Sequence, residues 1–283
     1  MKTENSIFVQ KLIDEMQLRN YSSRTITTYS ILLSKVEHFF GTSLDKITTD
    51  QLKAYLHQRI LKEGISVSLV NQTISAYKIL ETDILKRDWS QIRLRRPRKE
   101  KKLPVILSLE EIERMIVTTQ NIKHKAIIML AYSAGLRRQE LRQMRTSAID
   151  SSRMQVRVVQ GKGKKDRVTI LSSKMLDLLR LYYKYYRPSV YLFEASGHRG
   201  KYLADSTLNQ IIKQSARRAN IKKQVSFHTL RHCFATHLLE KGVNLKLIQQ
   251  FMGHVSLKTT SVYLHLVNVN PASIVSPLDS MNI

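Results

Sequence analysis

The sequence predicts a mainly α-helical protein made of two domains joined by a basic segment. Apolar residues recur at intervals of three and four through the first 90 positions, which is the spacing of amphipathic helices. One pair of alternating segments, near residues 154–172, indicates a small β-hairpin within a second and largely helical region. We therefore expect a helical bundle over residues 1–90, a linker over 91–103, and a mixed α/β, mostly helical domain over 104–283.

The first domain contains four predicted helices. Gly41 and Gly64 are typical helix-ending residues, and Thr48 with Gln51 forms a capping box at the start of the third helix. The helices are expected over about 7–16, 23–40, 49–63 and 70–84. Helices of this length, each with one apolar face, pack as a compact bundle.

The linker over residues 91–103 carries almost only positive charge. Pro97 interrupts any helix there, and like charges extend such a segment. The whole chain has a net charge of +25 and a pI near 10.2, which favours nucleic acid over anionic membrane as its partner. We expect the linker to lie along a DNA backbone, with a solvated tether as the alternative. Its candidate DNA contacts are Arg93, Arg95, Arg96, Arg98 and Lys99.

Composition excludes several other classes of protein. With 42% hydrophobic residues among 283, the chain can build real cores, yet it has no apolar run long enough to span a membrane. The start at Met1–Asn5 lacks the pattern of a signal peptide, so we expect a cytoplasmic protein. The single cysteine, Cys233, excludes an internal disulfide and a multi-cysteine metal site. It is interpreted as a small buried side chain, and a catalytic thiol is the less favoured alternative.

The second domain begins with a capping box, Ser108 with Glu111, and continues with an apolar helix that is closed by residues 134–136. Another helix is expected from about Arg138. Strands over 154–160 and 167–172 enclose a glycine-rich basic turn. Further helices are expected over about 173–186, 205–219, 228–241, 244–252 and 256–266, followed by an irregular tail.

Four local features carry chemically useful side chains. They are Arg137 with Glu140 at a helix junction, Lys162 on the hairpin turn, the pair His228 and Arg231, and His254 followed by Tyr263. Each has an ordinary structural interpretation when taken alone: a helix-terminal ion pair, a turn lysine, two residues on one helix face, a helix cap and a core tyrosine. Their order and their surroundings are more specific than any one of them.

In this order and context the chain resembles the tyrosine recombinase (phage integrase) family over essentially its whole length. The matching segments are AGLRRQEL at 134–141, GKGKKDR at 161–167, HTLRHCFATHL at 228–238, LIQQFMGH at 247–254 and TTSVY at 259–263. Within the family, residues 190–194 and 274–279 are similar to integrases of bacterial mobile elements. The resemblance implies a SAM-like core-binding domain followed by the tyrosine recombinase catalytic domain.

The resemblance also implies a reaction. Tyr263 would attack the scissile phosphate of duplex DNA, leaving a 3′-phosphotyrosyl bond and a free 5′-hydroxyl that a partner strand can use to reverse the step. Arg137, Arg231 and His254 match the residues that hold the phosphate oxygens, where planar guanidinium donors suit the developing charge. Glu140 would position Arg137.

Two further residues match those that move protons. Lys162 matches the general acid that protonates the leaving 5′-oxygen. Lys164 and Lys165 lie close enough in sequence to be mistaken for it, and they are also candidate DNA contacts. His228 matches a histidine that assists proton transfer or orients the phosphate.

The expected partners are double-stranded DNA carrying specific recombination sites and three more copies of the chain, as a homotetramer on two sites in the bacterial nucleoid. Protomers would be linked through the C-terminal tail, with Ile274, Val275 and Leu278 as the docking residues. Pro271 and Pro277 argue against a long docking helix, and a frayed terminus is the alternative. No cofactor is expected, since no metal-ligand spacing or phosphate-binding loop occurs in the sequence.

Three other functions remain open from sequence. A non-catalytic DNA-binding relative would not need every matched position to hold a chemically competent residue. A type IB topoisomerase shares the chemistry but relaxes a single duplex. A helix-turn-helix regulator built on residues 228–252 would leave Tyr263 and Lys162 without a role. Among recombination reactions, integration or excision of a mobile element is favoured over inversion or dimer resolution, which use the same chemistry.

Overall fold

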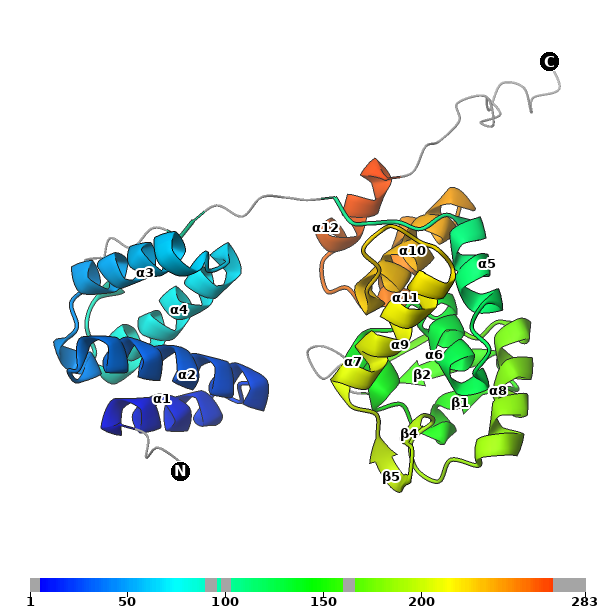
Figure 1. Cartoon of the computed structure of the whole chain (residues 1–283), viewed down its shortest axis with the longest axis horizontal. Helices are drawn as coiled ribbons and strands as arrows, with labels where there is room; N and C mark the ends of the chain where they lie inside the picture. The colour runs from blue at the N-terminus through cyan, green and yellow to red at the C-terminus, as the bar shows by residue number, and fades with distance from the viewer. Residues whose placement is uncertain (1–5, 90–95, 98–102, 160–165, 267–283) are drawn as a thin grey trace, which may run out of the picture. The chain divides into compact units, whose positions relative to one another are not determined.

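The computed structural model describes residues 6–89, 96–97, 103–159 and 166–266 (Figure 1). The chain divides into two compact units, Met1–Lys102 and Leu103–Ile283. Both are mainly helical, which confirms the predicted fold class. Within the described ranges, no helix has the length and apolar character needed to cross a membrane.

The first unit is a bundle of four α-helices with two short helical turns. Its elements are α1 (Ile7–Leu18), α2 (Ser23–Phe40), η1 (Leu44–Lys46), α3 (Thr49–Glu63), α4 (Val67–Ile79) and η2 (Leu80–Ile84). The predicted capping box is present, because the Thr48 hydroxyl accepts from the Gln51 amide and the Gln51 side chain accepts from the Thr48 amide. Gly41 and Gly64 end α2 and α3 in the left-handed conformation, at φ of 60° and 61°, as predicted.

One helix of this bundle differs from its prediction. The fourth helix was expected to continue to residue 84, but α4 ends at Ile79 and the next five residues form a wider π-helical turn. In that turn Glu81 is only 2% exposed and pairs with Arg87 at 3.4 Å. The bundle core lies between the helices, where the Tyr77 hydroxyl donates to the main-chain oxygen of Ile47 at 3.1 Å.

The second unit combines a helical body with two small antiparallel sheets. Its helices are α5 (Leu109–Val117), α6 (Ile122–Ser133), α7 (Arg138–Arg142), η4 (Thr146–Ala148), α8 (Ser173–Tyr186), α9 (Asp205–Arg218), α10 (Phe227–Glu240), α11 (Leu245–Met252), α12 (Leu257–Thr260) and η5 (Ser261–His265). Its strands are β1 (Ile149–Asp150), β2 (Gln155–Val158), β3 (Arg167–Ile170), β4 (Glu194–Ala195) and β5 (His198–Tyr202).

The predicted hairpin is present as strands β2 and β3, which pair antiparallel with Val156 opposite Thr169. Both strands are shorter than expected, and β1 adds a third strand beside β2. The turn at 160–165 lies outside the described residues. The second hairpin, β4 with β5, was not predicted, because the sequence HRGKY of β5 has no apolar alternation and its strand is exposed or half-buried throughout.

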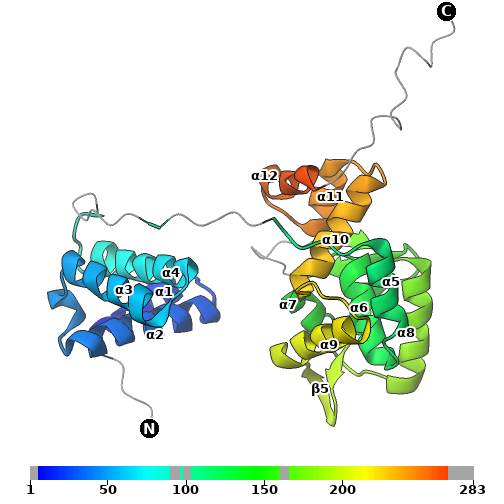
Figure 2. The same ribbon diagram turned by 45° about the horizontal axis from the view of Figure 1, so that its top comes forward.

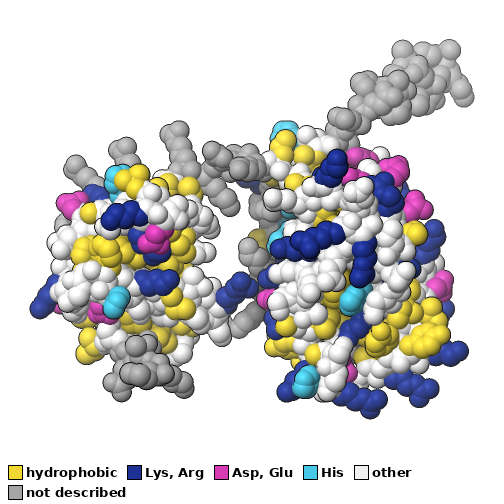
Figure 3. All heavy atoms as spheres, viewed as in Figure 1, with side chains coloured by type: hydrophobic (Ala, Val, Ile, Leu, Met, Phe, Trp, Pro, Cys, Tyr) yellow, Lys and Arg dark blue, Asp and Glu magenta, His cyan; other side chains and the backbone are white. Residues whose placement is uncertain are grey.

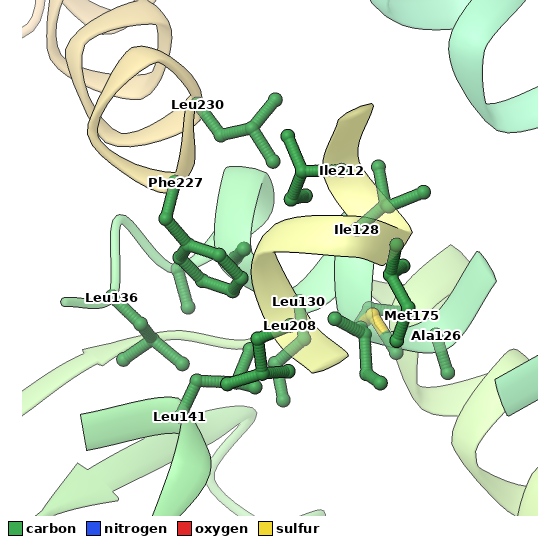
Figure 4. Packing of buried hydrophobic residues seen from close by; sticks show 14 of the residues in the cluster. Ala126, Ile128, Leu130, Leu136, Leu141, Met175, Leu208, Ile212, Phe227 and Leu230 are labelled. Carbon is green, nitrogen blue, oxygen red and sulfur yellow. The ribbon is translucent and has the colours of Figure 1, made fainter. Parts of the chain in front are cut away.

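The core of the second unit lies around α6, which is apolar on every side from Ala126 to Ala131. Figure 4 shows Ile128 and Leu130 of α6 among Leu208 and Ile212 of α9, Met175 of α8, and Phe227 of α10. Helix α10 packs against α6 on one side and against α11 and η5 on the other (Figures 1 and 2). Helix α10 therefore joins the core to the C-terminal helices.

The last described segment does not form the single helix that was expected over 256–266. Helix α12 is one turn long and continues as the tighter 3₁₀ turn η5. This turn carries Tyr263, whose side chain points inward and is 3% exposed. The change of helix type places the tyrosine against α10.

Candidate functional site

The centre of the candidate site is one buried carboxylate shared by three arginines. Glu140 accepts from Arg137 at 2.7 Å and forms a two-pronged ion pair with Arg167, Nη1 to Oε1 at 2.6 Å and Nη2 to Oε2 at 2.7 Å. Arg231 lies 3.9 Å away. Despite burial, the hydrogen bonds and charge of Arg167 and Arg137 lower the pKa of Glu140 to about 2, so it stays ionised. Three positive charges facing one negative charge leave the cluster with an excess of positive charge.

The same three arginines bind consecutive main-chain oxygens at the end of α11. Arg167 Nε donates to Phe251 at 2.8 Å, Arg231 Nη2 donates to Met252, and Arg137 Nη2 donates to Gly253 at 3.0 Å. The last carbonyls of a helix have no partner within the helix and form the negative end of its dipole. They therefore suit cationic donors.

Two glycines make these contacts possible. Gly135 and Gly253 both lie at φ of +59°. A Cβ on Gly135 would lie 2.3 Å from the Phe234 ring, and a Cβ on Gly253 would lie 2.7 Å from Arg167 Cδ. Gly135 also supplies the main-chain oxygen that accepts from Arg231 Nη1 at 2.5 Å. Both positions need glycine, because the backbone is left-handed and because the Phe234 ring and the Arg167 side chain leave no room for a Cβ.

Arg231 is 3% exposed, the deepest of the three arginines. Burial and the positive charge of Arg137 lower its pKa to about 9, so it remains a cation at neutral pH. A buried cation held by main-chain oxygens is a preorganised binding group for an anion that enters beside it.

His254 lies directly after Gly253 at the end of α11, and its Nδ1 shares a hydrogen bond of 2.9 Å with Thr260 Oγ1. Burial and the positive charges of Arg231, Arg137 and Arg167 lower its pKa to about 4. The ring is therefore neutral at neutral pH, with Nδ1 engaged by the threonine.

Tyr263 meets a second histidine. Its hydroxyl and Nδ1 of His232 share a hydrogen bond of 2.9 Å, and the two ring centroids are 5.7 Å apart. Burial raises the pKa of Tyr263 to about 12, against the opposing influence of Arg231 and Arg137. Both arginines therefore lie within electrostatic reach of the phenol.

Two cavities adjoin this cluster. The larger, about 1120 Å³, extends from Arg137 and His228 to Arg145, Arg157 and Tyr191. The smaller, about 550 Å³, is lined among others by Arg137, Arg167, Lys246 and His254. Arg137 borders both cavities. Figure 3 shows Lys and Arg side chains spread over the visible face of this unit, among fewer acidic ones.

Five of the residues predicted from sequence thus gather in one place: Arg137, His228, Arg231, His254 and Tyr263. Burial and the charges of Arg231, Arg138 and Arg137 lower the pKa of His228, which lines the larger cavity. Glu140 contacts Arg137 as predicted. Cys233 is buried, burial raises its pKa to about 11, and its Sγ accepts from the Leu107 amide at 3.2 Å.

Several predicted residues fall outside the described ranges. They are Lys162, Lys164 and Lys165 of the hairpin turn, Arg93, Arg95, Arg98 and Lys99 of the linker, and Ile274, Val275 and Leu278 of the C-terminal tail. Arg96 is described, and its guanidinium donates to the Asn71 main-chain oxygen at 3.3 Å and to Ser75 Oγ at 3.0 Å, both on α4. Among the described side chains, no group of three His, Cys, Asp or Glu residues is placed to hold a metal ion.

Three residues of the site were missed by the sequence analysis: Arg167, His232 and Thr260. All three stand inside the matching segments, within three residues of ones that were singled out. A signal for His232 was available, since it follows Arg231 directly and lies four residues after His228, on the same helix face. Arg167 gave no such signal, because its partner Glu140 is 27 residues away.

The fold and the site together are those of a tyrosine-type recombinase. Residues 106–268 match the family model described as the phage integrase family, and residues 8–91 match that of the phage integrase N-terminal SAM-like domain. The chain belongs to the phage integrase family.

Individual relatives agree with this assignment. The chain is 34% identical over 273 residues to a putative integrase/recombinase of Sinorhizobium fredii, which covers 95% of this chain and 88% of the relative. It is 33% identical over 262 residues to a tyrosine recombinase of Thermosipho africanus, covering 89% and 92%. Among solved structures, the XerA recombinase is 27% identical, with a TM-score of 0.54 and 95% of each chain covered. A Tn1549 transposon integrase bound to circular intermediate DNA is 17% identical, with a TM-score of 0.71 and coverage of 90% and 94%, and shares the fold.

Proposed function

We propose that this protein is a site-specific DNA recombinase that cleaves and rejoins duplex DNA through a 3′-phosphotyrosyl bond to Tyr263. The observation that carries the proposal is that Arg137 and Arg231 are both held at the end of α11, where Met252 packs in one buried cluster with Tyr263. A phosphate entering beside this cluster would meet two cationic, planar donors and a nucleophile.

The first step divides the work among the described residues. Tyr263 Oη attacks phosphorus, and the bond to the 5′-oxygen breaks. Arg137 and Arg231 stabilise the charge that grows on the non-bridging oxygens, and neutral His254 supplies a further donor through Nε2 when Nδ1 accepts from Thr260. Each well-placed donor of this kind is typically worth about 3 kcal/mol in the transition state.

Two other groups complete the reaction in this proposal. Lys162, on the hairpin turn, protonates the leaving 5′-oxygen, and His228 orients the phosphate from the side of the larger cavity. A metal ion or nucleotide is not required, because the arginines supply the positive charge and the tyrosine bond conserves the energy for rejoining. The 5′-hydroxyl of a partner strand reverses the step.

The wider assembly follows from the same family chemistry. We propose that residues 1–90 form a core-binding domain, that 91–103 form a basic linker on the DNA backbone, and that 104–283 form the catalytic domain. Solved recombinases with this fold are bound to DNA, XerH to difH and the Tn1549 integrase to circular intermediate DNA, which supports DNA as the partner. Exchange between two sites requires four protomers, which we propose are linked through their C-terminal tails on DNA of the nucleoid.

Among recombination reactions, integration or excision of a mobile element is the one we propose. The similarity to a putative integrase/recombinase over nearly the whole chain supports it. Inversion and dimer resolution use the same cleavage step and are therefore the second candidate.

The test is covalent capture. The protein is incubated, without metal or ATP, with labelled duplexes nicked near candidate sites from the DNA that flanks its gene, and the products are separated on denaturing gels. A protein-linked strand should form with wild type and disappear with Tyr263→Phe while DNA binding persists. Tyr185→Phe is the matched control, because Tyr185 on α8 is 71% exposed. Binding without any covalent product would favour a non-catalytic DNA-binding protein.

A further inference from the structure

We propose that His232 accepts the hydroxyl proton of Tyr263 as the tyrosine attacks DNA, which makes it a catalytic residue in addition to those already named. The inference rests on the proposed function, since it concerns the same cleavage step.

The contact is direct and is made between two elements that pack together. His232 lies in the second turn of α10, Tyr263 lies in η5, and these two elements pack against each other. Nδ1 and the phenol oxygen are 2.9 Å apart, within the range over which a proton passes between heavy atoms. The rings are inclined at 51°, so contact is made through the polar edge of the imidazole rather than by stacking.

Because Tyr263 is buried, its contact with His232 matters for removal of the hydroxyl proton. Tyr263 is 3% exposed, so bulk solvent has little access to its hydroxyl, and a proton leaving the oxygen needs an acceptor inside the protein. The half-buried ring of His232 stands between Tyr263 and His228, whose ring centroid is 6.3 Å from that of His232. His228 in turn lines the larger cavity.

Burial and the positive charge around His232 keep its ring uncharged and free to accept a proton. The titratable and charged groups that face it are His228 and Arg231 on α10, His254 after α11, and Tyr263 on η5. Burial, followed by His228 and Arg231, lowers the pKa of His232 to about 4. At neutral pH the imidazole is therefore uncharged and carries one nitrogen lone pair.

Before DNA binds, the proton stays on Tyr263, because burial holds the pKa of the phenol near 12. It transfers as the oxygen–phosphorus bond forms, since an aryl phosphodiester oxygen no longer holds a proton. The negative charge of the bound phosphate also favours the imidazolium. In the balanced step, the Tyr263 O–P bond forms, the P–O5′ bond breaks, the phenol proton passes to His232 Nδ1, and the leaving 5′-oxygen takes a proton from Lys162.

The kinetic test uses His232→Asn in the full-length chain. An asparagine amide can still hydrogen-bond the hydroxyl of Tyr263 but cannot take up its proton, so it separates positioning from proton transfer. On a nicked duplex whose scissile phosphate carries a 5′-bridging sulfur, the leaving thiolate needs no protonation, and the measured rate reports attack by Tyr263. We expect single-turnover cleavage to slow by about 100-fold or more, the usual scale of general base catalysis, with DNA affinity unchanged.

His265→Asn is the matched control, because His265 lies on the same 3₁₀ turn and is exposed to solvent. It should cleave at the wild-type rate. If His232→Asn also cleaves within about threefold of wild type, the histidine is at most a positioning residue and the proposal is wrong. A different result would contradict the proposed function itself: wild-type protein that makes no covalent product, or a Tyr263→Phe variant that still makes one.

A second measurement reads the wild-type protein directly and needs a variant only to assign the signal. Nitrogen NMR of histidine-labelled wild-type protein, with Tyr263→Phe to assign the signal, reports which ring nitrogen of His232 carries the proton. An unprotonated Nδ1 that shifts when Tyr263 loses its hydroxyl is the expected result. A protonated Nδ1 that donates to the phenol oxygen would overturn the proposal, because that nitrogen would have no lone pair to accept with.

Discussion

Arg167 and Glu140 form a two-pronged ion pair, with both guanidinium nitrogens within 2.7 Å of the carboxylate oxygens. Glu140 holds Arg137 through its other lone pairs, and Arg167 also binds the end of α11. Arg167 therefore positions Glu140, and Glu140 in turn positions Arg137, one of the two proposed phosphate-binding arginines. Arg167 on β3 thus sets the geometry of Arg137, the residue just before α7.

Arg167→Lys should impair cleavage although it preserves the charge. An ammonium group cannot make the fork to Glu140 and the bond to Phe251 together, so Arg137 loses its rigid support. We expect the single-turnover cleavage rate to fall by about 10-fold or more with DNA affinity within about twofold of wild type. Arg180→Lys is the control, since Arg180 on α8 is 67% exposed. Unchanged cleavage by Arg167→Lys would mean that Arg137 is positioned without it.

Folding stability should decline in acid in two stages. His232 and His254 have native pKa values near 4, below their ordinary value of 6.5, so the unfolded chain binds their protons first and stability is lost as the pH falls from about 6.5 towards 4. Glu140, with a native pKa of about 2 against an ordinary 4.5, contributes stability that is lost between those values. Urea unfolding at pH 7 and pH 5 measures the first stage.

Removing one histidine tests that assignment. His254→Asn should reduce the loss of unfolding free energy between pH 7 and pH 5 by about 1 to 2 kcal/mol. His38→Asn on α2 provides the comparison. An equal loss in wild type and His254→Asn would show that His254 is not held neutral in the native protein.

Gly135→Ala should damage both stability and the site. The new methyl group would lie 2.3 Å from the Phe234 ring and would strain a left-handed backbone whose oxygen accepts from Arg231. Gly41→Ala has nearly the same φ but meets nothing within 4 Å, so it should cost only about 1 to 2 kcal/mol of conformational strain. We expect Gly135→Ala to cost at least about 2 kcal/mol more by urea unfolding. Equal costs would mean that the Phe234 ring moves aside freely.

Arg145→Gln should weaken DNA binding in a salt-dependent way. Arg145 is exposed and lines the larger cavity beside Arg137 and His228. If it contacts a phosphate, the slope of log affinity against log salt should become shallower by about 0.9. Arg180→Gln, away from the residues that line the cavity, should leave the slope unchanged. A slope unaltered by Arg145→Gln would exclude that contact.

Much of the fold followed from local patterns in the sequence. The capping boxes of Thr48 and Ser108 and the helix stops at Gly41 and Gly64 are all present, because each depends on neighbouring residues alone. The β4–β5 hairpin and the break between α12 and η5 were missed. Tyr202 in β5 is held by Arg142, whose guanidinium lies 4.3 Å from the ring centroid, and that partner is 60 residues distant in sequence.

In the site too, local sequence patterns identified individual residues but not the contacts between distant ones. The matching segments pointed to Arg137, Arg231, His254 and Tyr263, and the structure brings these residues together. The pattern did not indicate that Glu140 would be shared or that His232 would meet Tyr263 across 31 positions. Those facts depend on how α10, α11 and η5 pack, and periodicity contains no information about which helices become neighbours.

The contacts at the end of α11 should make this segment intolerant of insertions and deletions. Three adjacent carbonyls, from Phe251 to Gly253, each serve a different arginine. A side-chain substitution at Phe251 or Met252 preserves the oxygens, whereas the insertion or deletion of one residue displaces all three acceptors at once. Active relatives should therefore accept other apolar side chains at Phe251 and Met252, which pack in the core, but keep the number of residues between α11 and His254 constant.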